Sequence, residues 1–86
     1  MFTFEFKNEA AREINKLPAK ERARILHKLK FYAQQENPLF FAEKLTDFRF
    51  GEIRFRVGDY RMICDINGSK IIVLKVGHRK DIYKSV

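Results

Sequence analysis

The first residues of the chain alternate between apolar and polar side chains. Phe2, Phe4 and Phe6 are each followed by a polar residue. An alternation with a period of two is typical of a strand with one buried face. The sequence therefore predicts an opening strand.

The apolar spacing then changes to that of helices. Asn8 can cap a helix that begins at Glu9 and stops at Pro18, which can itself sit in the first turn of a second helix over residues 19–36. The apolar faces of the two helices consist of Ala10, Ile14, Leu17, Ile25, Leu26, Leu29, Tyr32 and Ala33. Two helices joined so tightly form an αα-hairpin.

The second half of the chain alternates again. After a predicted loop over residues 39–48, strands are expected near 49–57, 60–67 and 70–77. Turns at Gly58-Asp59 and Asn67-Gly68 separate them. The predicted fold is α+β, with the helical hairpin on one face of a mainly antiparallel sheet and a short C-terminal segment. We expect residues 1–86 to form a single domain.

The Gly58-Asp59 turn predicts an unusual pair of arginines. A two-residue turn sets Arg56 opposite Arg61, and Arg54 then projects from the same face of the sheet. Like charges directly opposed across two strands are destabilising by up to ~1 kcal/mol. A phosphate between them would turn this repulsion into binding, because the planar guanidinium donates two parallel hydrogen bonds to such an anion.

The same register leaves an alternative open. Glu52 and Asp65 fall on the arginine face and can each neutralise one guanidinium, which would give a solvated face of salt bridges. The second turn is also ambiguous. If Asn67-Gly68 forms a two-residue turn, Cys64 faces Ile71 and Met62 faces Val73. In this register Lys75 lies on the helix side and His78 leaves the sheet on the arginine side. A three-residue loop reverses these faces.

The composition narrows the class of partner. The formal net charge is +7, which favours an anionic partner such as nucleic acid. The only cysteine, Cys64, excludes an intramolecular disulfide and has no second cysteine nearby for a metal site. No signal peptide or run of about 20 apolar residues is present, so we expect a cytoplasmic protein with no membrane contact.

Chemistry is also concentrated after the last predicted strand. His78, Arg79 and Tyr83 lie within six residues. Histidine can exchange protons near neutral pH, and tyrosine can stack on an unpaired base. Each also has a structural explanation, since His78 can be an ordinary surface residue and Tyr83 can anchor the tail.

The segments Arg54–Arg61 (RFRVGDYR) and Val76–Tyr83 (VGHRKDIY) together resemble the RelE/ParE superfamily of type II toxin–antitoxin toxins, with the RelE branch the better match. The resemblance extends over the whole chain. It implies a metal-independent endoribonuclease that needs no cofactor and cleaves mRNA in the ribosomal A site, so that translation stops. It also implies an antitoxin partner, acidic and partly disordered, that folds as a helix on the toxin; Phe40 and Phe41 are candidates for this contact, or for the core.

The resemblance assigns roles to individual residues. Arg54, Arg61, Arg79 and Tyr83 match the catalytic positions, and Arg56, His78 and Lys80 lie beside them as expected RNA contacts. Glu52 stands where RelE-type sites place a lysine, so it is either a bystander that pairs with Arg54 or a general base. Two other functions stay open: a ParE-like toxin that inhibits DNA gyrase, and a non-catalytic or decayed RelE-fold binding module.

Overall fold

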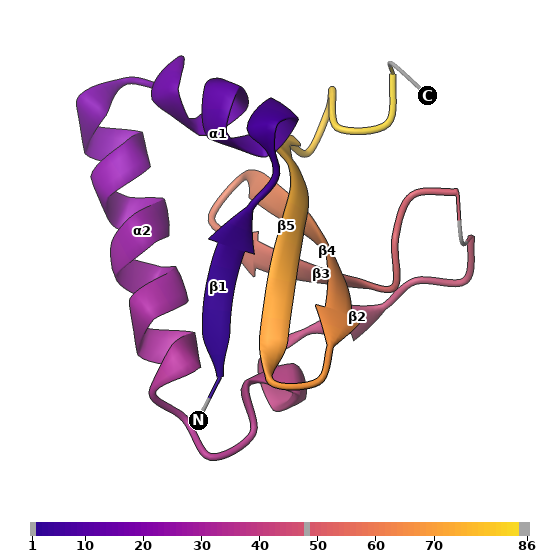
Figure 1. Ribbon diagram of the computed structural model, residues 1–86. Coiled ribbons are helices and arrows are strands. Elements are labelled where there is room, and N and C mark those ends of the chain that lie inside the picture. The colour runs from indigo at the N-terminus through magenta and orange to yellow at the C-terminus, as the bar shows by residue number, and fades with distance from the viewer. Residues whose placement is uncertain (1, 48, 85–86) are drawn as a thin grey trace.

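The computed structural model describes residues 2–47 and 49–84 (Figure 1). Helices α1 (Asn8–Asn15) and α2 (Ala19–Ala33) lie on one face of a mixed five-stranded sheet with the strand order β1-β5-β4-β3-β2. The elements that remain are β1 (Thr3–Phe6), the 3-10 helix η1 (Pro38–Phe41), β2 (Glu43–Lys44), β3 (Ile53–Val57), β4 (Tyr60–Asn67) and β5 (Lys70–His78). The predicted α+β architecture is confirmed. Phe48, part of the predicted loop, and the last two residues of the predicted tail lie outside the described residues.

The helix boundaries correct two predictions. Asn8 is the first residue of α1 rather than its cap; the N-cap is Lys7, which has no side-chain capping hydrogen bond. Helix α2 ends at Ala33 and not at Glu36. Pro38 restricts only Asn37, which is extended with φ −134° and ψ 91°, so it does not explain why the helix ends before residues 34–36.

The core lies between the helices and the sheet. Phe55 on β3 is fully buried, with its ring stacked on Tyr32 of α2 at 5.1 Å and edge-on to Phe4 of β1 at 5.6 Å between centroids. The predicted stripe of α2 is correct for Ile25, Leu29 and Tyr32, but Leu26 is 44% exposed. Residues at i, i+4 and i+7 share one helix face, whereas Leu26 is rotated about 100° away from Ile25.

A β-bulge changes the pairing of the last two strands. The tight turn is Gly68-Ser69 rather than Asn67-Gly68, and it pairs Cys64 with Val73. The next pair is Ile63 with Lys75, so Leu74 is the extra residue. The predicted pairs of Cys64 with Ile71 and Met62 with Val73 are therefore wrong.

Helix α1 covers the part of β5 that extends beyond the short strand β1. The backbone N–H of Val76 donates to Glu13 Oε1 at 2.9 Å. Lys75 Nζ lies 3.2 Å from Glu9 Oε1 and 3.7 Å from Glu13 Oε2. These contacts satisfy an edge that would otherwise present unpaired backbone groups, and they fix α1 against the sheet.

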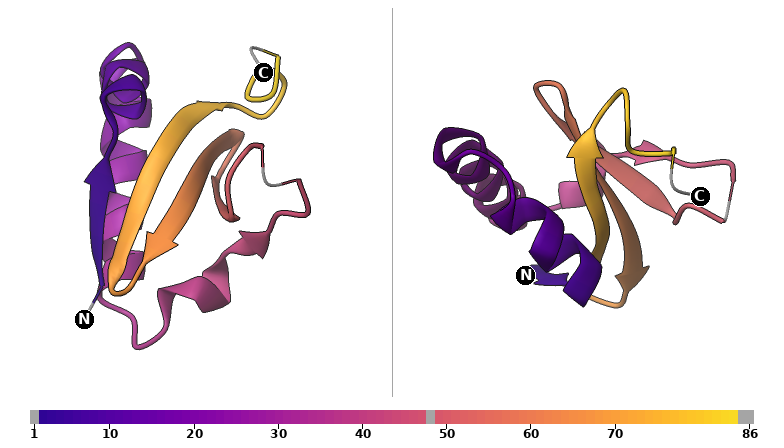
Figure 2. Two further views of the ribbon diagram at one scale, coloured as in Figure 1. Left: turned by 45° about the vertical axis from the view of Figure 1, so that its right-hand side comes forward. Right: turned by 90° about the horizontal axis from the view of Figure 1, so that it is seen from above.

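On the other side of the sheet, the segment between β2 and β3 folds over β4 (Figure 2). Gly51 has a φ of +146°, and a Cβ there would lie 2.7 Å from Ile63 Cγ2. This close approach buries Ile63 completely. It also explains why β3 begins at Ile53 and not at residue 49, since residues 49–52 leave the strand direction to cover β4. The predicted loop contains the unexpected β2 and η1.

Candidate functional site

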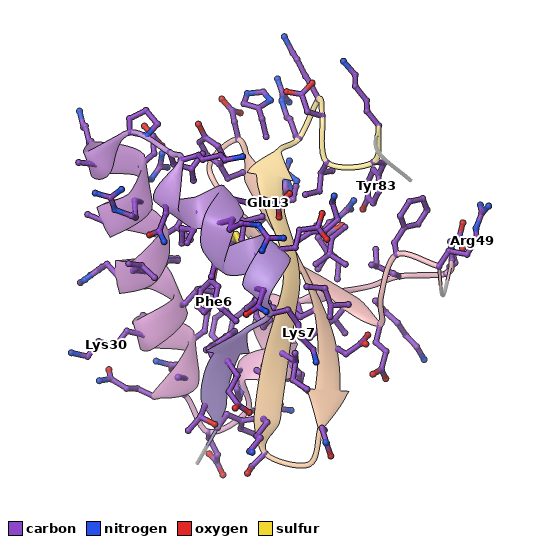
Figure 3. The ribbon with its side chains drawn as sticks, turned by 45° about the horizontal axis from the view of Figure 1, so that its top comes forward. Phe6, Lys7, Glu13, Lys30, Arg49 and Tyr83 are labelled. Atoms are coloured by element: carbon purple, nitrogen blue, oxygen red, sulfur yellow. The ribbon has the colours of Figure 1, made fainter. Side chains whose placement is uncertain are left out.

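The arginine hairpin has the predicted register. Arg56 pairs with Arg61, Phe55 with Met62 and Arg54 with Ile63 across the Gly58-Asp59 turn. Gly58 has a φ of +59°, a conformation that favours glycine and allows so short a turn. Because opposed residues share a face, the three arginines project from the side away from the helices, which is the side where Tyr83 and Arg49 lie in Figure 3.

Arg54 is engaged at both terminal nitrogens. Nη2 lies 2.8 Å from Glu43 Oε2, and Nη1 donates to the Tyr83 hydroxyl at 2.8 Å. Its Nε is buried and has no hydrogen-bond partner among the described residues. The hydrogen bond to Glu43 raises the pKa of Arg54, so this guanidinium stays charged and holds the two side chains in place.

Sequence reasoning missed Glu43. It reaches the site because β2 pairs with β3 and sets Glu43 opposite Arg54. The Arg54 hydrogen bond lowers the pKa of Glu43, and the charges of Arg54, Arg56 and Arg61 lower it further. A strand of two residues leaves no periodicity, so the sequence offers no signal for this placement beyond an acidic residue in a predicted loop.

Glu52 and Asp65 do not neutralise the arginines. Glu52 Oε1 accepts a hydrogen bond from the backbone N–H of Ile66 at 3.0 Å, and Asp65 Oδ1 accepts one from the backbone N–H of Glu52 at 3.2 Å. Both hydrogen bonds connect Glu52, in the segment between β2 and β3, to strand β4. The alternative in which these acids form salt bridges with the arginine face is therefore wrong, and Glu52 forms no recorded ion pair with Arg54 among the described residues.

The charges of the neighbouring arginines act on Arg61. Its Nη1 donates to the backbone oxygens of Gly58 at 2.9 Å and Tyr60 at 3.0 Å. Burial lowers the pKa of Arg61, and the charges of Arg56, Arg54 and Arg79 lower it further against an opposing effect of Glu43. Within residues 2–47 and 49–84, no carboxylate lies within salt-bridge distance of Arg56 or Arg61.

Arg79 is linked to the hairpin turn. Its backbone N–H donates to Asp59 O at 2.7 Å, and its Nε lies 3.6 Å from Asp59 Oδ1. Both side chains are more than half exposed. We define the arginine cluster as Arg54, Arg56, Arg61 and Arg79; in the described part of the chain only Glu43 and Asp59 form ion pairs with it.

His78 lies on the other face. The bulge at Leu74 shifts the register, so that His78 pairs with Tyr60, and the two rings meet edge-on at 5.7 Å between centroids. The expectation that His78 leaves the sheet on the arginine side is therefore wrong. Lys80 is exposed beside Arg79, and its backbone N–H donates to His78 Nδ1 at 3.2 Å.

Tyr83 is held at the edge of the cluster. Its hydroxyl accepts from Arg54, and its ring lies edge-on to Phe50 with 4.5 Å between centroids. The buried anchor of the C-terminal segment is Ile82, which is 2% exposed and packs beside Gly77. Sequence reasoning missed both Phe50 and Ile82. The available signal for the buried anchor was that Ile82 is an apolar residue next to Tyr83 in a polar segment.

The chemistry of this arrangement is that of anion binding. Of the four guanidinium groups, that of Arg54 contacts the Glu43 carboxylate and the Tyr83 phenol, and that of Arg79 lies near the Asp59 carboxylate. The described residues contain no group of three or more His, Cys, Asp or Glu that could hold a metal ion. Cys64 is buried, which raises the pKa of its thiol. In residues 2–47 and 49–84, neither helix is long and apolar enough to cross a bilayer.

Comparison with known proteins places the chain in a family. Residues 4–83 match the family model of the ParE toxin of the type II toxin–antitoxin system parDE. Toxin RelG of Mycobacterium tuberculosis (strain ATCC 25618 / H37Rv) is 29% identical over 85 residues, which cover 96% of this chain and 97% of RelG.

Two solved structures share the fold. The toxin–antitoxin complex RelBE2 of M. tuberculosis contains a chain with a TM-score of 0.78 and 28% identity, covering 91% of this chain and 98% of that one. The RelB–RelE antitoxin–toxin complex of Methanococcus jannaschii gives a TM-score of 0.73 and 25% identity, covering 94% and 96%. With the family model spanning both helices and every strand but the first residue of β1, the chain belongs to the RelE/ParE superfamily and is a type II toxin–antitoxin toxin.

Proposed function

We propose that this toxin is an mRNA endonuclease that acts at the ribosome and needs no metal. The observation that carries the proposal is the arginine cluster, in which Arg56 and Arg61 face each other without a neutralising carboxylate among the described residues. Such an arrangement costs stability unless an anion occupies it. The RelE-type relatives favour RNA as that anion, and action on the ribosome places the protein in the cytoplasm.

The reaction needs three functions on one face. The RNA 2′-hydroxyl attacks the adjacent phosphorus while the bond to the 5′-oxygen breaks, giving a 2′,3′-cyclic phosphate and a 5′-hydroxyl end. A base must remove the 2′-proton, an acid must supply one to the 5′-oxygen, and cations must stabilise the extra negative charge on the phosphorane.

We assign these functions by position. Arg61 and Arg79 would bind the scissile phosphate, with Arg79 as a proton donor or charge stabiliser. Glu43, rather than Glu52, would take the 2′-proton, because Glu43 lies at the cluster while Glu52 is directed to the backbone of Ile66. Arg54 would position Glu43 and Tyr83, to which it is already bonded, and Tyr83 would orient the nucleotide. Arg56 and Lys80 would contact neighbouring phosphates.

Expression in growing cells tests the proposal. The wild-type toxin should stop translation, and primer extension should reveal cuts at fixed positions within codons. Arg61→Ala and Arg79→Ala should each lower cleavage by a factor on the order of 10² to 10³, the usual loss when one stabilising donor is removed. Lys16→Ala, which removes an exposed charge on the helical side, is the matched control. Full toxicity of both arginine variants would contradict the assigned site.

A second candidate has one observation in its favour, the ParE name of the matching family model. A ParE-like toxin would inhibit DNA gyrase through protein contacts and would not need unpaired arginines. Loss of supercoiling by purified gyrase, together with intact mRNA in toxin-expressing cells, would select this function. A product that harms neither process would select a decayed toxin.

An antitoxin is the expected partner. Both structural relatives are complexes of a toxin with RelB. Phe40 is 86% exposed, and Phe41, which stacks on Tyr32 at 5.2 Å, is 46% exposed. We propose that an acidic segment encoded beside this gene covers them as a helix. Co-expression should give a stable complex that Phe40→Ser weakens; if no neighbouring product binds, the two-component arrangement is wrong.

A further inference from the structure

A groove lies between helix α2 and the β3–β4 turn, outside the arginine cluster proper. Its volume is about 600 Å³. In Figure 1 the β3–β4 turn reaches toward the N-terminal half of α2, and this approach forms the groove. Its lining residues are Lys20, Ala23, Arg24, His27, Lys28, Arg56, Val57 and Gly58.

The groove is lined by cationic groups without an acid. Lys20, Arg24 and Lys28 are spaced four residues apart, so they lie on one face of α2 over about 12 Å of its length. Arg24 Nη1 lies 3.9 Å from Glu21 Oε2, which is a long contact between partly exposed groups. Such a pair contributes little and leaves the groove strongly positive.

The hairpin turn is shaped to admit the arginine. A Cβ at Gly58 would lie 2.7 Å from Arg24 Nη1 and 2.8 Å from Nη2. The Arg24 guanidinium therefore rests against the turn, in the space that a side chain at residue 58 would take. On the far side Lys28 is oriented by the aromatic rings of Phe31 at 5.2 Å and Tyr32 at 5.6 Å.

Arg56 connects the groove to the cluster. It lines the groove and also pairs with Arg61 on β4. Beyond Arg54, β3 has no partner on its outer edge among the described residues, because β2 pairs only with Ile53 and Arg54. The groove therefore ends beside the cluster, at the strand residue that faces Arg61.

We infer that this groove binds the sugar–phosphate backbone of single-stranded RNA on one side of the cleavage point. The inference rests on the proposed nuclease function and adds a second set of phosphate contacts to it. An extended, regularly charged polymer fits a row of cations 12 Å long better than a single anion does, and long basic side chains bind phosphate irrespective of base sequence.

A binding measurement tests the groove separately from catalysis. The probe is a fluorescent 12-nucleotide RNA with 2′-O-methyl groups, which lacks the attacking hydroxyl and stays intact. The groove variant is Lys20→Gln/Arg24→Gln/Lys28→Gln. The control, Lys7→Gln/Lys16→Gln/Lys30→Gln, removes the same net charge from exposed positions outside the groove; Lys30 points away from the sheet in Figure 3. Thermal melting of both variants verifies that they fold.

The groove variant should bind the 12-mer at least tenfold more weakly than wild type, and the control within threefold. The slope of log affinity against log salt should fall in magnitude by about 2, since each lost contact to a single strand contributes about 0.7. Equal weakening of the 12-mer by both variants, or none, would overturn the inference.

A protein occupant is the competing outcome. A peptide of twelve glutamates should compete with the RNA far less than unlabelled 12-mer does at equal charge concentration; equal competition would assign the groove to an acidic protein and overturn the inference. The two proposals fail separately. If wild-type toxin cuts mRNA and the groove variant binds RNA normally, only the groove is wrong, whereas RNA binding that depends on the groove without any cleavage would contradict the nuclease proposal.

Discussion

The two faces of the sheet differ in the side chains that they bring together. On the helix side, Phe55, Met62 and Val73 are fully buried and pack without polar interruption. On the other side, Arg56 opposes Arg61, and the buried Nε of Arg54 lacks a partner among the described residues. The packing on the first face lowers the free energy of the folded state, whereas the opposed arginines on the second raise it.

The difference between the two faces indicates that the functional residues lie on the arginine face. A chain selected only for folding would not set two guanidinium groups directly opposite each other, because the pair repels and each long side chain loses rotamer freedom. The hairpin that carries the cluster is supported from behind by Phe55 and Val57, so the packed face holds the repulsive one in place. Removal of a core side chain and removal of one of the opposed arginines should therefore change stability in opposite directions.

The largest effect is expected in the core. Phe55→Ala removes a fully buried ring that contacts Tyr32 and Phe4, so it should lower the free energy of unfolding by about 3–5 kcal/mol. Urea denaturation measures the change. Phe40→Ala, at a ring that is 86% exposed, should stay within about 0.5 kcal/mol of wild type. Equal losses in the two variants would remove the distinction between the faces.

A smaller effect of opposite sign is expected in the cluster. Arg56→Gln relieves the charge opposite Arg61 without breaking any recorded side-chain hydrogen bond, so stability should rise by up to ~1 kcal/mol. For a domain of this size that corresponds to an increase of roughly 4–8 °C in melting temperature. Lys30→Gln, an exposed cation on α2, should leave the melting temperature unchanged.

Added phosphate tests whether the stability change in Arg56→Gln comes from relieved repulsion between Arg56 and Arg61. At ten times its dissociation constant, an anion that binds only the folded state stabilises it by about 1.4 kcal/mol. Added phosphate should therefore raise the melting temperature of wild type more than that of Arg56→Gln. A destabilised Arg56→Gln protein, or equal phosphate effects in both, would show that the arginines do not repel each other in the free toxin.

Local features of the site could be predicted from the sequence. The pairing of Arg56 with Arg61 follows from Gly58-Asp59 alone, because a two-residue turn fixes the register of its own hairpin. The face of β1 follows similarly from the alternation of Phe2, Phe4 and Phe6.

Features that depend on contacts distant in sequence could not be predicted. The face of His78 depends on the bulge at Leu74, and residues 71–76 are almost entirely apolar, so no periodicity marks the extra residue. Glu43 and Glu52 are both acids near the hairpin. Only the pairing of β2 with β3 decides that Glu43 reaches Arg54, while the turn at Gly51 directs Glu52 to the backbone of Ile66.

The smallest effect concerns the carboxylate that reduces the repulsion. Glu43→Gln should destabilise the protein at pH 7 by about 0.2–1 kcal/mol, the range of exposed ion pairs, since the Glu43 side chain is 47% exposed. The pKa of Glu43 is lowered in the folded state from its usual 4.5. Its contribution is thus complete above that value and is lost as the pH falls through the lower folded pKa.

The melting temperatures of wild type and Glu43→Gln should therefore differ at pH 7 and converge as the pH falls below 4.5. Glu36→Gln, at an exposed acid without a recorded ion pair, should match wild type throughout this range. A gap that stays constant as the pH falls below 4.5, down to acid unfolding, would mean that Glu43 acts through packing or neutral hydrogen bonding. In that case the contact between Glu43 and Arg54 would not stabilise the protein through the charge of Glu43.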